Sequence, residues 1–417
     1  MARRQPIQLS TLASGLRLVT ETMPGALSVS TGVWVGVGAR DEPVELSGVS
    51  HFLEHLLFKG TPTRGARDIA EAVDRVGGDM NAFTAKELTA YYTRLPTRDW
   101  RLGVEILGDV LSNPSLRKAD VETEREVILE ELGMDEDAHD DRVMTLLADA
   151  LFPNHPLGRE TAGERHTVTA ITPAAVRSFF RRWYRASNMV VSMAGPVDHE
   201  EARVAVEAAF SGTSGGGSPQ RVAPLAAVKP LALLRRKAEQ THFAVGYRAF
   251  ARGDSDREAL DVANQVLGGG PASRLFDEIR ERRGLAYSVY SGASAFADAG
   301  ALTVYVATSP GNVSEVARLV DLEVARMAAK GITDRELDVA KGYLSGSFVL
   351  GLEDSASRMS RLANHVTLRG SVRPVADQLK RYDAVTRADV QRAFQRVVAT
   401  PRVLAAVGPV TKQQLGL

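Results

Sequence analysis

The sequence predicts two tandem, homologous α+β domains joined by a linker rich in glycine and serine. Its 417 residues, of which 44% are hydrophobic, exceed what a single hydrophobic core usually serves. The segment SGTSGGGSP at 211–219 is too small and polar to form a packed element. We therefore expect a first domain at 1–210, a linker at 211–222 and a second domain at 223–417. Strands and helices mix in each half without regular alternation, which favours antiparallel-rich sheets with helices packed on them.

The elements of the first half follow from apolar periodicity and from β-branched or aromatic content. In order, we expect a strand at 27–37, a helix containing HFLEH (51–55), a helix at 68–76, strands within 80–95, and a helical stretch over 98–151 that breaks near Asn113. In the second half we expect a strand at 242–250, a helix at 257–267, a helix at 273–283, and strands at 286–296 and 301–308.

A repeated pattern at the end of each half indicates that the halves are diverged copies. TPAAVRSFFRRWY begins at Thr172 and TRADVQRAFQRVV at Thr386. Both segments open with a threonine suited to cap a helix and continue with apolar residues at helical spacing. An apolar strand follows each, ending in Gly-Pro-Val at Gly195 and Gly408. We therefore expect the same fold in both halves.

Composition excludes several classes of protein. Lys plus Arg and Asp plus Glu both number 51, so the basic excess typical of nucleic-acid binders is missing. The chain has no cysteine, which excludes disulfides, thiolate metal sites and a cysteine nucleophile. Neither an apolar signal-peptide core nor a run of roughly 20 apolar residues is evident. We expect a cytoplasmic protein that binds neither nucleic acid nor membrane.

The segment VSHFLEHLLF (49–58) carries the pattern of a metallohydrolase. His51 and His55 are four residues apart, so both imidazoles leave the same face of a helix and can bind one zinc ion. Glu54 shares that face and can take a proton from the attacking water. The order His-x-x-Glu-His inverts the commoner His-Glu-x-x-His motif but keeps its parts.

A third ligand has to come from elsewhere, because a catalytic zinc ion usually has three protein ligands. The acidic helix VETEREVILEE (121–131) is the obvious donor. Glu124 and Glu131 are two turns apart on one face, and Glu130 is rotated by about 100° from Glu131. The chemistry alone leaves Glu124, Glu130 and Glu131 open.

The chain resembles the insulinase, or pitrilysin-type, peptidases (family M16), and is closest to the small bacterial processing peptidases, which in turn resemble the mitochondrial processing peptidase β subunit. The resemblance covers essentially the whole chain. The matching segments, in family order, are HFLEHLLFKGT (51–61), GGDMNAFTAKELTAYY (77–92), ETEREVILEEL (122–132), HPLGR (155–159) and SRLFDEIRERRGLAYSVYS (273–291).

The resemblance implies roles for individual residues. His51, His55 and Glu131 match the zinc ligands, and Glu54 matches the catalytic base. Glu124 matches a glutamate that supports the site, as hydrogen-bonded outer groups do. A further segment, Asn81, Ala82, Phe83 and Thr84, matches an edge strand on which the family pairs substrate backbone by β-augmentation.

The second half has a different implied role. Arg280 and Tyr287 match a pair that contacts substrate or the tetrahedral intermediate. If the halves are duplicates, HFLEH falls opposite ALDVA (259–263), which offers no ligand set, so we expect one zinc ion per chain. Large family members enclose a chamber with four such domains. This chain has two, and it carries both the ligands and the pair, so a homodimer is expected, with a heterodimer as the alternative.

The function implied is a zinc endopeptidase that cleaves unstructured peptides or leader segments inside a closed chamber. The alternative is a non-catalytic scaffold or peptide-binding subunit on the same fold. Two histidines and one carboxylate can also hold manganese, cobalt or iron, so zinc is the expected metal rather than the one the donor set requires.

Overall fold

Each half of the chain builds one β-sheet, and the two sheets share a strand topology. The computed structural model describes residues 7–416. The first sheet has the order β1-β2-β6-β3-β5-β4, with strands β1 (Ile7–Thr11), β2 (Arg17–Thr22), β3 (Ser28–Val35), β4 (Asp79–Thr84), β5 (Thr89–Pro96) and β6 (Met189–Gly195). The second has the order β7-β11-β8-β10-β9, with strands β7 (Leu231–Arg235), β8 (Thr241–Ala249), β9 (Ala286–Ala295), β10 (Gly300–Thr308) and β11 (Val403–Gly408).

Apart from β1, which has no counterpart in the second sheet, the strands of the two sheets pair in the same way. In the first sheet β2 and β6 run parallel and the other neighbours antiparallel. In the second sheet β7 and β11 run parallel and the others antiparallel. The α+β fold of two homologous domains is therefore confirmed. The sheets are mixed rather than purely antiparallel, because each contains one parallel pair.

The repeated segment has the same local structure in both halves. Thr172 caps α7 (Pro173–Trp183) by accepting from Ala175 N, and Thr386 caps α14 (Arg387–Val398) by accepting from Asp389 N. The strand that follows each helix ends at a glycine with positive φ, +148° at Gly195 and +136° at Gly408. A side chain at either position would be strained, which explains why both copies have glycine there.

Packing divides the chain differently from the expected ranges. The first unit runs to Leu132 and includes Glu160–Gln220 and Val349–Arg373, and the second comprises Gly133–Arg159, Arg221–Phe348 and the chain from Pro374 on. The division at Gln220 falls inside the expected linker, 211–222. However, residues 133–159 of the first half and 349–373 of the second half each pack in the other unit, whereas we expected domains at 1–210 and 223–417.

The apolar faces of two helices explain this exchange. Helix α12 (Ser355–Arg369) covers one face of the first sheet, where its buried residues Met359, Leu362, Ala363 and Val366 meet Trp34, Ala90 and Val190. Helix α5 (His139–Leu151) covers one face of the second sheet, where Val143, Leu147 and Leu151 meet Ala244, Tyr305 and Ala405. Both helices repeat apolar residues at the spacing of one helical face.

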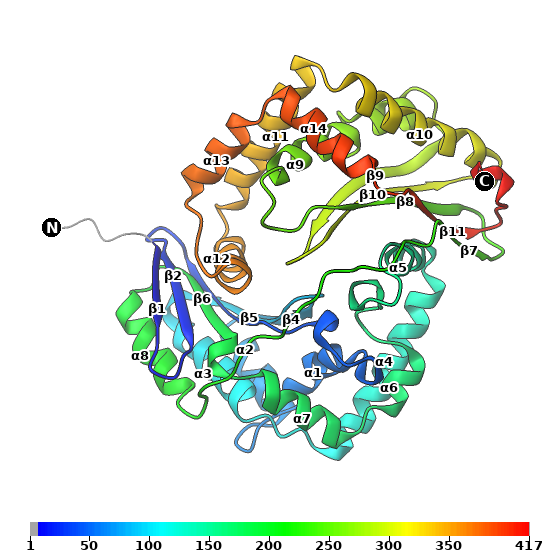
Figure 1. The fold of residues 1–417 in the computed structure, drawn as a ribbon. Coiled ribbons are helices and arrows are strands. Elements are labelled where there is room, and N and C mark those ends of the chain that lie inside the picture. Colours follow the sequence, from blue (N-terminus) through cyan, green and yellow to red (C-terminus); the bar gives the residue numbers. More distant parts are fainter. Residues whose placement is uncertain (1–6, 417) are drawn as a thin grey trace. The chain divides into compact units, whose positions relative to one another are not determined.

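The opposite face of each sheet packs against several helices (Figure 1). In the first unit these are α1 (Val49–Leu57), α2 (Ala66–Asp74), α3 (Trp100–Ser112), α4 (Lys118–Asp137), α7 and α8 (His199–Ala209), with the short α6 (Arg165–Ala170). In the second unit they are α9 (Arg257–Leu267), α10 (Val313–Lys330) and α14, with α11 (Asp334–Gly351). Helix α13 (Val375–Ala384) contacts α9, where Arg381 donates to Glu258.

Two predicted helices differ in detail from the structure. The stretch over 98–151 breaks near Asn113, as expected, but breaks again at Ala138, between α4 and α5. The segment expected as a helix at 273–283 winds as a π-helix over Phe276–Glu281. The linker has no helix or strand over 211–220, and Gly215 ties it to the first unit through Ser14 O (3.2 Å) and Ser187 N (2.9 Å).

None of the helices within residues 7–416 is long and apolar enough to cross a bilayer. The expectation that the chain has no signal peptide rests partly on residues 1–6, which lie outside the described residues. The cytoplasmic location stays a prediction.

Candidate metal centre

Helix α1 presents His51, Glu54 and His55 on the face opposite its core residues. Val49, Phe52, Leu53, Leu56 and Leu57 are buried in the first unit, so the helix cannot rotate without exposing them. The rings of His51 and His55 lie edge to face, with centroids 4.7 Å apart. The burial of one face therefore determines where the two imidazoles point.

The start of α1 is fixed by Gly48 and Glu42. Gly48 has φ of +97°, and a Cβ there would come within 2.5 Å of Ala162 O, so another residue would be strained and would clash. The buried carboxylate of Glu42 accepts from Gly48 N (2.8 Å) and Ser50 N (2.7 Å). Hydrogen bonds to a charged group contribute roughly 1.5–3 kcal/mol, and a negative charge at a helix N-terminus is favourable.

Helix α4 brings Glu131 to the two histidines. Glu131 Oε2 lies 3.8 Å from His51 Nε2 and 3.6 Å from His55 Nε2. Among residues 7–416, these three side chains form the one group of three or more His, Asp or Glu residues whose ligand atoms all lie within 4.8 Å of one another. The structure thus brings together the three residues that the resemblance implies as ligands.

The other two glutamates on α4 have different surroundings. Glu124 is buried, and its Oε2 lies 3.1 Å from His55 Nδ1, the ring nitrogen that does not face Glu131. Glu130 is exposed, as its rotation around the helix from Glu131 predicts. Of the alternatives left open by chemistry, Glu131 is the one placed beside both Nε2 atoms, and Glu124 is placed behind His55.

The donor set fits a tetrahedral zinc ion. Ligand atoms about 2.0–2.2 Å from zinc at tetrahedral angles lie about 3.4 Å from one another, close to the 3.6 Å and 3.8 Å found here. Burial, together with the neighbouring His55, lowers the pKa of His51 to about 4, with Glu160 opposing the shift. His51 is therefore neutral at pH 7, the form in which an imidazole binds a metal.

Glu54 is held by a threonine of the adjacent strand. Thr84 Oγ1 donates to Glu54 Oε2 at 2.6 Å, which orients the carboxylate and leaves its second oxygen to accept a proton. Burial raises the pKa of Glu54, and this outweighs the opposing effects of the Thr84 hydrogen bond and of His55. A carboxylate with a raised pKa is a better base than an exposed glutamate.

A pocket of about 290 Å³ opens beside these groups. It is lined by Glu54, His55, Phe58, Lys59, Ala66, Asn81, Ala82 and Glu124. Asn81 and Ala82 belong to β4, which is one of the two edge strands of the first sheet. The predicted substrate segment 81–84 is therefore an edge strand next to the histidines, and Thr84 at its end contacts Glu54.

Two protein-family models identify the family to which this chain belongs. A family model described as Insulinase (Peptidase family M16) matches residues 17–165. A second model, described as Peptidase M16 inactive domain, matches residues 170–344. The chain belongs to the insulinase family, peptidase family M16. The M16 model for the first half includes all the ligand candidates, as well as Glu54 and β4.

The M16 relatives align along nearly the whole chain. Proteins named as uncharacterized zinc proteases are 44% identical over 405 residues in Mycobacterium tuberculosis, 43% over 416 in Streptomyces coelicolor and 34% over 403 in Bacillus subtilis. These alignments cover 96%, 98% and 97% of this chain and 92%, 91% and 98% of the relatives.

Solved structures show the same M16 fold. A chain from Pseudomonas fluorescens, described as a peptidase M16 inactive domain, superposes with a TM-score of 0.91 at 20% identity and 98% coverage of both chains. A protease from Helicobacter pylori gives 0.89 at 21% identity, covering 96% of this chain and 99% of its own.

Arg280 and Tyr287 lie within the second M16 region and next to each other. The Arg280 guanidinium lies over the Tyr287 ring (4.5 Å) and over the Phe276 ring (4.7 Å). Tyr287 is 76% exposed, so it is not the strand core residue that its apolar ring would allow. Cation–π contact with Tyr287 orients Arg280 within the second unit. The catalytic role implied for the pair stays a prediction.

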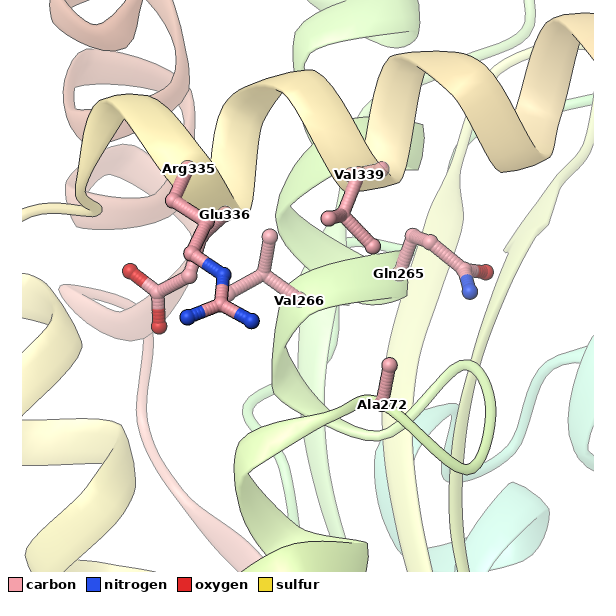
Figure 2. Close-up of a pocket in the computed structure, with 7 residues that line it drawn as sticks. Gln265, Val266, Ala272, Arg335, Glu336 and Val339 are labelled. Carbon is pink, nitrogen blue, oxygen red and sulfur yellow. The ribbon is translucent and has the colours of Figure 1, made fainter.

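The second unit also contains a separate pocket of about 210 Å³ beside α9 and α11 (Figure 2). Val266 and Val339 form part of its apolar wall, and Glu336 is its carboxylate. Arg274 donates to Glu336 through Nε (2.6 Å) and Nη2 (2.9 Å). Although burial alone would raise the pKa of Glu336, these bonds and those from Thr333 lower it to about 2. Glu336 therefore serves as a structural ion-pair partner rather than as an acid or base.

Three contributions to the site escaped the sequence analysis. Glu42 caps α1 although it lies six residues before Gly48 in the sequence, a separation that matches no standard capping pattern. The ammonium of Lys59 forms an ion pair with Glu124, and the hydroxyl of Thr84 donates a hydrogen bond to Glu54. The last two connect residues far apart in the chain, and no spacing signals such contacts.

Proposed function

We propose that this chain is a zinc-dependent endopeptidase that cleaves unstructured peptides or leader segments. One observation carries the proposal: the Nε2 atoms of His51 and His55 converge on Glu131 Oε2, beside a carboxylate that a strand-edge threonine orients. The relatives named as zinc proteases support zinc as the metal. One zinc ion per chain agrees with the single ligand group found among residues 7–416.

In this mechanism His51, His55 and Glu131 hold the metal, and Glu54 moves the proton. A bound zinc ion supplies Lewis-acid chemistry, since it makes water more acidic and polarises the scissile carbonyl. Glu54 takes the proton of the attacking water and delivers it to the leaving amine. Thr84 orients Glu54 by donating to Oε2, and this bond favours the ionised form against the effect of burial.

Strand β4 supports a peptide as the substrate. An extended peptide can add to the edge of a sheet through backbone hydrogen bonds, which demand little of its sequence. Asn81, Ala82, Phe83 and Thr84 form this edge, and Asn81 Oδ1 accepts from Ala82 N at 2.8 Å. When a peptide substrate pairs with this edge, Ala82 N would donate to a backbone carbonyl of the substrate in place of Asn81 Oδ1. An unfolded segment offers unpaired backbone groups of this kind along its whole length.

The roles of the second half and of the assembly are part of the same proposal. Arg280 and Tyr287 would stabilise the developing oxyanion. A homodimer, with each copy carrying a ligand set and the Arg/Tyr pair, would form the closed chamber. Sedimentation of the purified chain would give its assembly state.

Peptide cleavage tests the proposal directly. We expect the purified chain to cleave a quenched, unstructured peptide and to leave a folded protein of similar composition intact. A chelator should abolish cleavage, and added zinc should restore it. If the chain binds zinc and the peptide but never cleaves it, the protein is instead a peptide-binding subunit on the M16 fold, and the enzyme proposal is wrong.

A further inference from the structure

We propose that Lys59 is a positioning residue of the metal centre, which holds the Glu124 carboxylate so that this carboxylate holds the His55 ring. The inference rests on the proposed zinc site and deepens it. Lys59 Nζ lies 2.6 Å from Glu124 Oε1, and Glu124 Oε2 lies 3.1 Å from His55 Nδ1. One carboxylate thus connects the ammonium and the imidazole through its two oxygens.

The burial of Glu124 makes the lysine necessary. The Glu124 side chain is 4% exposed, and a buried carboxylate is costly unless it is paired and hydrogen-bonded. With the ammonium on Oε1, rotation of the carboxylate would break a charge-assisted bond. Lys59 therefore fixes Oε2 as the acceptor for His55 Nδ1–H, and Nε2 is left with its lone pair toward Glu131.

The position of Lys59 is itself determined by its backbone. It follows Phe58, the residue that caps the end of α1, and its N–H donates to Leu56 O (3.1 Å) while its carbonyl accepts from Arg117 Nη2 (3.0 Å). It lies four residues after His55, in the turn that ends α1. A lysine here is held at a fixed distance from Glu124 rather than reaching it by chance.

The two histidines differ in this support. Nδ1 of His51 is buried and makes no hydrogen bond to the residues that the structure describes, whereas Nδ1 of His55 has Glu124. Of the two imidazoles, His55 is thus the one whose Nδ1 has a side-chain partner, and the lysine contacts that partner. Groups that orient metal ligands in this way typically contribute 10- to 100-fold to metal affinity.

Zinc affinity, measured by competition with a chromophoric chelator on the full chain, tests the inference. We expect Lys59→Met to weaken zinc binding by about 10-fold and Lys59→Arg, which keeps the charge, to restore affinity to within about threefold of wild type. Lys118→Met is the matched control, since Lys118 is exposed on the first turn of the same α4 helix that carries Glu124. It should bind zinc as wild type does.

A double-mutant cycle shows whether Lys59 acts through Glu124. Glu124→Gln should weaken zinc binding by about 10- to 100-fold, and adding Lys59→Met to it should change affinity by less than about twofold, because the two residues act as one unit. If the effects of the two substitutions on zinc affinity multiplied instead, the inference would be wrong.

Lys59 also lines the pocket beside Glu54, so a substrate contact is the competing explanation. In that case Lys59→Met would raise KM for the peptide while zinc affinity stayed at the wild-type value, and the inference would be wrong. Absence of zinc binding in the wild type would instead contradict the proposed function, so the two failures are distinguishable.

Discussion

Glu54→Gln is expected to lower kcat/KM for an unstructured peptide by about 10²- to 10⁴-fold, the contribution usual for a general base. The amide has the size of the carboxylate and can still accept from Thr84, but it cannot take a proton from water. Because Glu54 lies beside the ligand set rather than in it, zinc affinity should stay within about threefold of wild type. Cleavage and zinc affinity measured on one preparation separate these two effects.

Two outcomes would contradict the role given to Glu54. Cleavage within about tenfold of wild type would mean that another group takes the proton. Loss of zinc together with loss of cleavage would mean that Glu54 is a ligand. Glu45→Gln is a suitable control, since Glu45 is an exposed residue of the short 3-10 helix before α1, and it should leave both quantities unchanged.

Glu131→Gln should remove most of the bound zinc, and cleavage with it. The substitution replaces the anionic ligand with a neutral amide, which is a poor donor for zinc, and leaves two imidazoles to hold a doubly charged ion. We expect zinc affinity to fall by at least about 100-fold, measured by chelator competition and by metal content after dialysis. Excess zinc should restore little activity.

The neighbouring glutamate provides the control. Glu130→Gln makes the same chemical change one position away on α4, where the side chain is exposed, and should retain zinc and activity. If zinc stays in Glu131→Gln and is lost in Glu124→Gln, the third ligand is Glu124, and the geometry at Glu131 has been misread.

The sequence predicted the parts of the structure that depend on local pattern. Helix α1 and its ligand face follow from the spacing of His51 and His55 and from apolar residues at helical intervals. The shared sheet topology follows from the repeated segments that begin at Thr172 and Thr386. In these cases the interacting groups lie within a few turns or in duplicated positions, where periodicity is informative.

The exchange of α5 and α12 between the two units could not be predicted in this way. Both helices have one apolar face, and such a face shows that a helix is packed without showing on which sheet. The sequence around Leu147 or Leu362 therefore predicts a buried residue but does not indicate which sheet that residue contacts. The hydrogen bonds from α1 to Glu42 and the contact between Lys59 and Glu124 could not be predicted either, because only the tertiary fold brings the partners together.

Anomalous diffraction at the zinc absorption edge, from crystals of the full chain grown with zinc, tests the central claim most directly. The account predicts a peak in the first unit about 2.0–2.2 Å from His51 Nε2, His55 Nε2 and a Glu131 oxygen, and no comparable peak in the second unit. Absence of a peak between these three residues, or a peak held by Glu124 in place of Glu131, would contradict it.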